Sequence, residues 1–198
     1  MNLKYVNIAG AFLIVGVVQF VIMLIIAMAL FGFVISSNYI SDLGAMCRAN
    51  FCIVVQPSST IFNSSVITLG VFLCIASYFI LRGARARVLS TLIAVAGVGA
   101  IGVGVFPESA GLIHAVFALI TFLFGGLALI SSHKILSGFV RVIVPIMGFV
   151  SLVLLIFFAL RIDLGLGVGG VEMLIVFLEL LATIIIGSFL AGLRQFSL

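Results

Sequence analysis

Long apolar runs with short polar interruptions dominate the pattern of this chain. Each run reaches the length of about 20 residues that a helix needs to cross the hydrocarbon core of a bilayer. The interruptions hold most of the charged residues, as in the segment Arg82 to Arg87. The pattern therefore predicts an all-α fold, a polytopic transmembrane bundle of six helices. We expect these helices over residues 8–36, 60–81, 88–106, 111–132, 139–160 and 171–193.

The runs favour helices over the strands of a membrane barrel. A spanning strand alternates apolar and polar residues over about ten positions, whereas these runs are apolar throughout. In lipid, a helix satisfies the backbone of such a segment internally. The first run is also far longer than the roughly 7–15 apolar residues of a signal-peptide core. We therefore expect it to remain in the mature protein as a spanning helix.

The basic residues fall mainly on one side of the predicted bundle. If the N-terminus is cytoplasmic, the cytoplasmic side holds Lys4, Arg82, Arg85, Arg87, Lys134, Arg141 and Arg194. The other side holds only Arg48 and Arg161. Cytoplasmic loops carry an excess of Lys and Arg, so we expect both termini inside. Loop 82–87 is then cytoplasmic and loop 37–59 extracytoplasmic, in a multi-pass protein of the cell membrane.

Composition agrees with a membrane protein. Of the 198 residues, 65% are hydrophobic and 7% are charged, and the mean hydropathy is +1.56. A soluble domain is about a quarter charged, so this chain lacks the side chains that would cover a soluble surface. The length suits a single domain over residues 1–198. The net charge of +4 does not indicate nucleic-acid binding, because the basic residues are spread over short loops and form no single patch.

Small residues in two predicted helices indicate close contacts between helices. Ala96, Ala100 and Gly104 recur at four-residue intervals, and Gly187 and Ala191 repeat the spacing in the last helix. Such spacing lets helix backbones approach closely in lipid. We expect these faces to pack inside the bundle, which is otherwise surrounded by membrane lipids. Contact with a second copy or with another membrane protein through the same faces is the alternative.

The longest interruption runs from Ser36 to Ser59 and contains Cys47 and Cys52. Oxidising conditions outside the cell favour a disulfide between them. The closed loop is short, so the chain-entropy account gives a stabilisation of roughly 2–3 kcal/mol. Free thiols and redox catalysis are the alternatives. A thiol oxidase would generally need a further cysteine pair, and the remaining Cys74 lies within an apolar run.

Several motifs along the chain match the pattern of one membrane family. They are Asn38-Tyr39-Ile40-Ser41-Asp42-Leu43-Gly44, Phe62-Asn63, the run Gly97 to Gly104 followed by Phe106-Pro107-Glu108, His114, and Gly170-Val171-Glu172. In these motifs the chain resembles the integral membrane family catalogued as domain of unknown function nine-nine-eight. The resemblance covers nearly the whole chain and implies a six-helix bundle of archaeal and bacterial membranes, with no established activity. A more distant similarity is to DRAM and Frag-type membrane proteins, which share an Ile-Ser-Asp-x-Gly element after the first helix.

Five polar residues from different segments fall near the outer side of the predicted bundle: Asp42, Asn63, Glu108, His114 and Glu172. Polar groups at membrane depth are costly and often mark function, so we expect them to line a polar pocket open to the outside. His114 and Asp42 would form a proton-transfer pair there. Alternatively, Asp42, Glu108 and His114 would hold a divalent metal, although no cofactor is predicted. Without chemistry, Asp42 caps a turn and His114 makes an interhelical hydrogen bond.

Glu179 is the one acidic residue predicted at mid-depth. It lies two turns beyond Glu172 on the same face of the last helix. As a structural residue, it would be protonated and bonded to a neighbouring helix. As a functional residue, it would be a relay position in a proton or ion path.

These residues support three hypotheses for the function. The first is a protein that binds or transports a lipid headgroup or a small polar solute through the outer pocket. The second is an intramembrane enzyme that acts on lipids with the same residues as acid–base groups or metal ligands. The third is a membrane scaffold or assembly subunit without chemistry. A continuous polar path through Glu179 would favour transport, and a bound metal would favour the enzyme.

Overall fold

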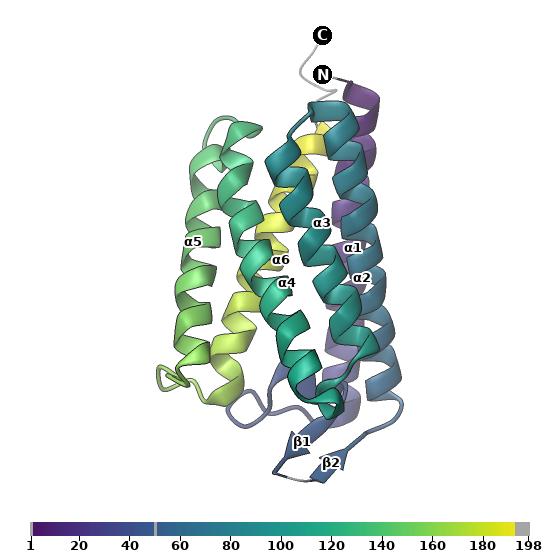
Figure 1. The fold of residues 1–198 in the computed structure, drawn as a ribbon, viewed down its shortest axis with the longest axis vertical. Helices are drawn as coiled ribbons and strands as arrows, with labels where there is room; N and C mark the ends of the chain where they lie inside the picture. The colour runs from purple at the N-terminus through teal and green to yellow at the C-terminus, as the bar shows by residue number, and fades with distance from the viewer. Residues whose placement is uncertain (1, 50, 193–198) are drawn as a thin grey trace.

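The computed structural model describes residues 2–49 and 51–192 (Figure 1). These residues contain six helices that are long and apolar enough to cross a membrane. The helices are α1 (Leu3–Phe31), α2 (Ser58–Ala84), α3 (Arg87–Val105), α4 (Leu112–Ser131), α5 (Val140–Ala159) and α6 (Val168–Gly192). The predicted all-α transmembrane bundle is confirmed, and each predicted span corresponds to one helix.

Of the six predicted spans, the first differs most from its helix. Residues 8–36 were predicted, and both ends of this span were wrong. The helix begins at Leu3 because the side chain of Asn2 caps it, accepting a hydrogen bond from the backbone nitrogen of Tyr5 at 3.4 Å. It ends at Phe31 because the next residue, Gly32, caps it: the φ of Gly32 is left-handed at 74°, and its N–H donates to the carbonyl of Met28. Residues 33–35 are apolar but follow this cap. Residue 193 of the last predicted span lies outside the described residues.

The connection between α1 and α2 contains a short 3-10 turn, η1 (Ile40–Leu43), and an antiparallel hairpin of β1 (Met46–Arg48) and β2 (Phe51–Ile53). Cys47 pairs with Cys52 across the hairpin and forms the predicted disulfide, with an S–S distance of 2.11 Å. The turn η2 (Glu108–Ala110) joins α3 to α4, and η3 (Ser132–Lys134) follows α4. We call the end of the bundle that carries the strands the hairpin end. The opposite end, where α1 begins and α6 ends, is the termini end (Figure 1).

Five of the helices form a ring. Each helix packs against the next in sequence, and α6 returns to pack against α1. Because α6 also contacts α4, the ring closes without α5, which lies outside it against α4 and α6 (Figure 1).

Facing glycines allow three of these helix pairs to approach closely. They are Gly10 with Gly187 between α1 and α6, Gly70 with Gly97 between α2 and α3, and Gly126 with Gly148 between α4 and α5. In the first pair, a Cβ atom on Gly10 would lie 2.5 Å from the carbonyl oxygen of Gly187. Small residues predicted to mediate packing, such as Gly104 and Gly187, thus contact other helices of the same bundle. Self-association through such faces stays a prediction.

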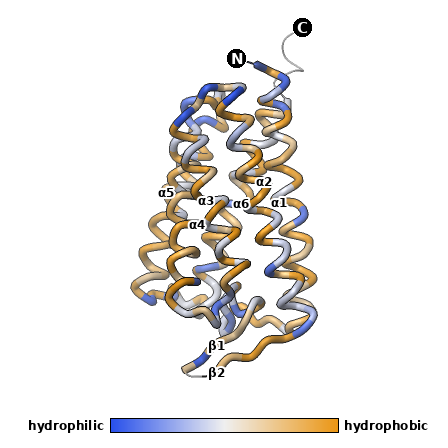
Figure 2. The backbone as a smooth tube through the Cα atoms, turned by 45° about the vertical axis from the view of Figure 1, so that its right-hand side comes forward, coloured by the Kyte–Doolittle hydropathy of each residue, from blue (hydrophilic) through white to orange (hydrophobic). Residues whose placement is uncertain are grey.

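Hydrophilic residues gather at the two ends of the bundle around a hydrophobic middle (Figure 2). The termini end holds Lys4, Arg82, Arg85, Arg87, Lys134 and Arg141, while Arg194 lies outside the described residues. The hairpin end holds Arg48 and Arg161 with the acidic residues Asp42, Glu108, Asp163 and Glu172. The charge asymmetry is therefore a property of the folded bundle. Which end faces the cytoplasm stays a prediction.

Candidate functional site

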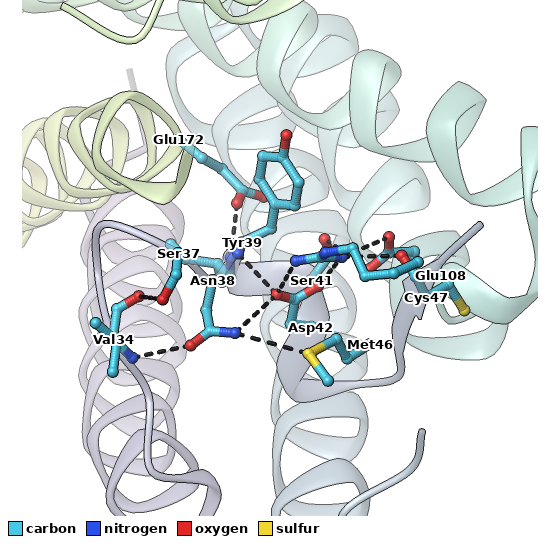
Figure 3. Close-up of polar contacts among 12 residues, drawn as sticks. Val34, Ser37, Asn38, Tyr39, Ser41, Asp42, Met46, Cys47, Glu108 and Glu172 are labelled. Carbon is cyan, nitrogen blue, oxygen red and sulfur yellow. Dashed lines mark hydrogen bonds and ion pairs between the residues drawn. The ribbon is translucent and has the colours of Figure 1, made fainter. Parts of the chain in front are cut away.

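The turn η1 is built around the buried carboxylate of Asp42, which is 1% exposed. The Oδ2 atom of Asp42 accepts hydrogen bonds from the backbone nitrogen of Tyr39 at 3.0 Å and from Nδ2 of Asn38 at 3.2 Å (Figure 3). A short carboxylate that bonds a backbone N–H three residues earlier stabilises a turn locally. Asp42 therefore has the turn-capping role that the sequence offered as the interpretation without chemistry.

Arg48, at the end of β1, forms a two-point ion pair with Asp42. Nη1 donates to Oδ1 at 3.0 Å and Nη2 to Oδ2 at 2.7 Å. The guanidinium also lies over the ring of Tyr39, 5.3 Å from its centroid. The hydrogen bond to Asp42 raises the pKa of Arg48 above its ordinary value. The disulfide next to Arg48 fixes the hairpin that carries it, so the ion pair connects the hairpin to η1.

Glu108 approaches the same turn from η2. Its Oε1 atom lies 3.7 Å from Nη1 of Arg48, and its Oε2 atom accepts a hydrogen bond from Oγ of Ser41 at 3.5 Å (Figure 3). Burial raises the pKa of Glu108 to about 7, and the nearby Asp42 adds to this shift, while Arg48 opposes it. Glu108 is thus poised to change its charge near neutral pH.

Glu172 reaches η1 from the first turns of α6. It is buried, and its Oε2 atom accepts a hydrogen bond from the backbone nitrogen of Ile40 at 2.6 Å (Figure 3). Three predicted site residues, Asp42, Glu108 and Glu172, therefore meet at η1 although they come from three segments of the chain.

The other two predicted residues bond elsewhere. The Nδ2 atom of Asn63 donates to Oγ of Ser59 at 3.2 Å, while its Oδ1 atom is buried with no hydrogen-bond partner among the described residues. This oxygen faces Gly44, where a Cβ atom would lie only 2.6 Å from it. His114 lies with Nδ1 2.8 Å from the carbonyl oxygen of Phe106, at the turn between α3 and α4. Its described contacts therefore do not include the predicted pairing with Asp42.

The predicted metal alternative would need Asp42, Glu108 and His114 to converge. Within residues 2–49 and 51–192, no three His, Cys, Asp or Glu side chains are grouped closely enough to hold a metal ion. Two of the three predicted ligands, Asp42 and Glu108, contact the guanidinium group of Arg48 instead.

A cavity of about 120 Å³ lies inside the ring of helices. Residues of α1, α2, α3, α4, α6 and η1 line it, and no residue of α5 does. The lining is largely apolar, as at Val17, Phe62 and Phe122. The polar residues among the lining are Ser41, Thr121, Glu172, Glu179 and Thr183. Of the five predicted pocket residues, only Glu172 faces this cavity.

The cavity extends from the hairpin end into the middle of the bundle. Ile40 and Ser41 of η1 line it at the hairpin end. Toward the termini end, its wall includes Leu13 and Ile186, which belong to a packed apolar core that continues to Leu190.

Glu179 lies on the cavity wall two turns beyond Glu172. Its Oε1 atom accepts a hydrogen bond from Oγ of Ser151 on α5 at 2.7 Å. The carboxylate occupies space that is free because residue 125 on α4 is a glycine; a Cβ atom on Gly125 would overlap Oε2. Glu179 keeps accessible surface inside the bundle because it faces the cavity.

Sequence reasoning missed the partners of these acidic residues. Arg48 entered only as a charge for the orientation, although it lies six positions from Asp42 in the same loop. Ser151 is a hydroxyl within an apolar span, a signal that suggests a hydrogen bond to a neighbouring helix. The role of Gly125 has no signal in the sequence, because it depends on which helix faces Glu179.

Comparison with protein families gives a match over residues 13–188 to the family described as Protein of unknown function (DUF998). No curated protein and no solved structure matches the chain.

Proposed function

Because the chain belongs to the family described as Protein of unknown function (DUF998), we propose its function from the geometry of its structure. The family description names no activity. The protein binds a small apolar or amphipathic molecule, such as part of a lipid, in the cavity inside its ring of helices. The polar group of this molecule lies beside Glu172 or Glu179. Relative to the polar outer pocket predicted from the sequence, the binding site is deeper and mostly apolar.

The observation that carries this proposal is the apolar cavity itself. Protein interiors are close-packed and rarely leave voids larger than a water molecule. At the usual free energy per unit volume, filling an apolar cavity of about 120 Å³ is worth at most roughly 3 kcal/mol. An apolar cavity of comparable size, about 150 Å³, binds benzene in an engineered protein. A ligand would recover part of this free energy.

The position of η1 supports access from the hairpin end. Ile40 and Ser41 line the cavity there, and three side chains from other segments hold the turn: Arg48, Glu108 and Glu172. The predicted orientation places this end outside the cytoplasm. A lipid headgroup that remained at the hairpin end would lie near Arg48 while an apolar part entered the cavity.

The test uses a fluorinated probe of the right size, 4-fluorobenzyl alcohol, with purified protein in detergent and detection by fluorine NMR. The variant Thr183→Phe fills the cavity, because Thr183 lines it. The matched control is Leu181→Phe, which adds the same ring on the exposed face of α6, where Leu181 is 51% exposed. Saturable binding to the natural protein and to Leu181→Phe, with none to Thr183→Phe, supports the proposal. Identical, non-saturable partitioning with all three proteins overturns it.

A further inference from the structure

The cavity contains two carboxylic side chains on one face of α6. Glu172 and Glu179 are seven residues apart, so their Cα atoms are separated by about 10 Å along the helix axis. Both line the cavity. Between and around them the wall is mostly apolar, with residues such as Val176 and Leu180 from the same helix.

The groups that contact Glu179 are neutral. Ser151 of α5 donates a hydrogen bond, and Gly125 of α4 provides the space for the carboxylate. The other helices of the ring present apolar residues to the cavity, including Phe20, Leu69 and Ala100. None of the described residues that line the cavity is Lys, Arg or His.

The charged groups nearest the cavity belong to the hairpin end. Glu172 accepts a hydrogen bond from η1, which also carries Asp42 and contacts Glu108. Arg48 forms its ion pairs with Asp42 and Glu108. The charge of Arg48 is thus already matched by two acidic residues, and Glu179 is left without a cationic partner among the described residues.

A carboxylate in an apolar site is stable only when a proton or a cation compensates its charge. From the position of Glu179 in this cavity we infer that the ligand is a small cation, a protonated amine with an apolar substituent, which binds in exchange for the Glu179 proton. This inference rests on the proposed function and names the class of ligand. The apolar substituent contacts the wall, and the ammonium group donates hydrogen bonds to the carboxylate.

The exchange balances in charge and in atoms. The empty site holds Glu179 as a neutral carboxylic acid. When the ammonium ion enters, the carboxyl O–H bond breaks, the proton leaves to the solvent, and the carboxylate pairs with the cation. The net charge of Glu179 together with its ligand is therefore zero in the bound state, as the charge of Glu179 alone is zero in the empty site. An anion would face the carboxylate without a compensating group, and a neutral molecule would gain no ion pair.

The experiment compares 4-fluorobenzylamine with 4-fluorobenzyl alcohol, which have nearly the same shape but differ in charge. Binding to purified protein in detergent is followed by fluorine NMR and by calorimetry in two buffers that differ in ionisation enthalpy. We expect the amine to bind at least tenfold more tightly than the alcohol. Each bound amine should release about one proton, and its affinity should increase with pH by up to tenfold per unit while the amine stays protonated.

Two variants separate the role of Glu179 from a general effect of charge. Glu179→Gln keeps an acceptor for Ser151 but cannot exchange a proton. It should bind the alcohol as the natural protein does and lose the preference for the amine. Asp163→Asn removes an acidic residue at the exposed hairpin end, whose side chain accepts a hydrogen bond from the backbone of Gly165. It should keep the full preference.

The outcomes distinguish the two proposals. Equal affinity for amine and alcohol, or a preference that survives Glu179→Gln, overturns the inference about charge and leaves cavity binding intact. Absence of saturable binding for both probes overturns the proposed function as well. Retained binding of the alcohol by Glu179→Gln shows that this variant is folded.

Discussion

Arg48 is the residue on which the arrangement of the hairpin end depends. It supplies the cation for Asp42, a carboxylate that is almost completely buried. Without Arg48, this carboxylate would keep its hydrogen bonds from Tyr39 and Asn38 but lose its counter-charge. Because the Arg48 side chain is 46% exposed, solvent screens the pair and its contribution is well below that of a buried ion pair.

We expect Arg48→Ala to destabilise the protein by about 1–2 kcal/mol. The measurement is thermal unfolding of the purified protein in detergent, where the midpoint should fall. Lys134→Ala is the control, since it removes an equal charge from an exposed position at the termini end. Equal midpoints for the two variants would show that the ion pair contributes nothing measurable.

Glu108 makes the stability of the same end depend on pH. Its pKa of about 7 in the folded protein is above the ordinary value of 4.5, so the folded chain holds a proton that the unfolded chain releases. The resulting stabilisation is complete below the ordinary pKa and is lost as the pH increases through about 7.

We therefore expect Glu108→Gln, which stays neutral, to become more stable relative to the natural protein as the pH increases from about 5 to 8. The difference between the two unfolding midpoints is the quantity to follow. Comparing the two proteins cancels the titration of other acidic residues. A difference that does not change with pH would contradict the shifted pKa.

At the residue scale, the sequence predicted which acidic residues gather at one end but not how they are held. Asp42, Glu108 and Glu172 are at helix ends that topology brings together. Asp42 and Glu172 accept hydrogen bonds from backbone nitrogens at η1, Glu108 accepts one from the Ser41 side chain, and Arg48 pairs with two of these carboxylates. Such pairing cannot be deduced from the position of each residue in the chain. His114 illustrates the same limit, because a carbonyl group in the adjacent turn satisfies its ring nitrogen.

The elements of the bundle were predictable because each apolar run is long enough to be a helix in lipid. The order of the helices around the cavity was not. In a membrane, helices choose neighbours through close backbone contacts and not through hydrophobicity, so the choice depends on pairs such as Gly10 and Gly187. The sequence marked Gly187 as a small residue in a helix face but gave no partner for it.

The contact between α1 and α6 closes the ring, and Gly10 permits it. A Cβ atom on Gly10 would meet two backbone atoms of α6, the oxygen of Gly187 at 2.5 Å and the nitrogen of Ala191 at 2.6 Å. Because backbone atoms cannot rotate away, Gly10→Ala should separate the helices and destabilise the protein by about 1–3 kcal/mol.

The matched control for Gly10→Ala is Gly192→Ala at the end of α6, where an added Cβ atom has no neighbour within 4 Å among residues 2–49 and 51–192. This control should unfold at the natural temperature or slightly above it, since alanine favours a helix. Thermal unfolding and the fraction of monodisperse protein after purification measure both variants. Comparable behaviour of the two would mean that α1 and α6 do not pack as described.

At the scale of the whole molecule, the excess of basic residues at the termini end predicts its orientation. Two exposed serines allow a matched test, Ser37 at the hairpin end and Ser137 at the termini end. In a Cys74→Ala background, a membrane-impermeant maleimide should label Ser37→Cys in intact cells. It should label Ser137→Cys only after the cells are permeabilised. The opposite result would invert the predicted topology and place η1 at the cytoplasmic surface.

The lengths of the helices have a consequence for the surrounding bilayer. The adjoining helices α1, α2 and α6 have 29, 27 and 25 residues, whereas α3, α4 and α5 have 19, 20 and 20. At the usual rise per residue, the first group is about 38–44 Å long and the second about 28–30 Å.

The shorter helices match a hydrocarbon core of about 30 Å. The end turns of the longer helices contain polar residues, such as Lys4 in α1 and Asn63 and Arg82 in α2, so these turns lie in the headgroup region. On the side formed by α1, α2 and α6, helical backbone therefore continues into the headgroup layer, whereas on the opposite side the helices end near the boundary of the hydrocarbon.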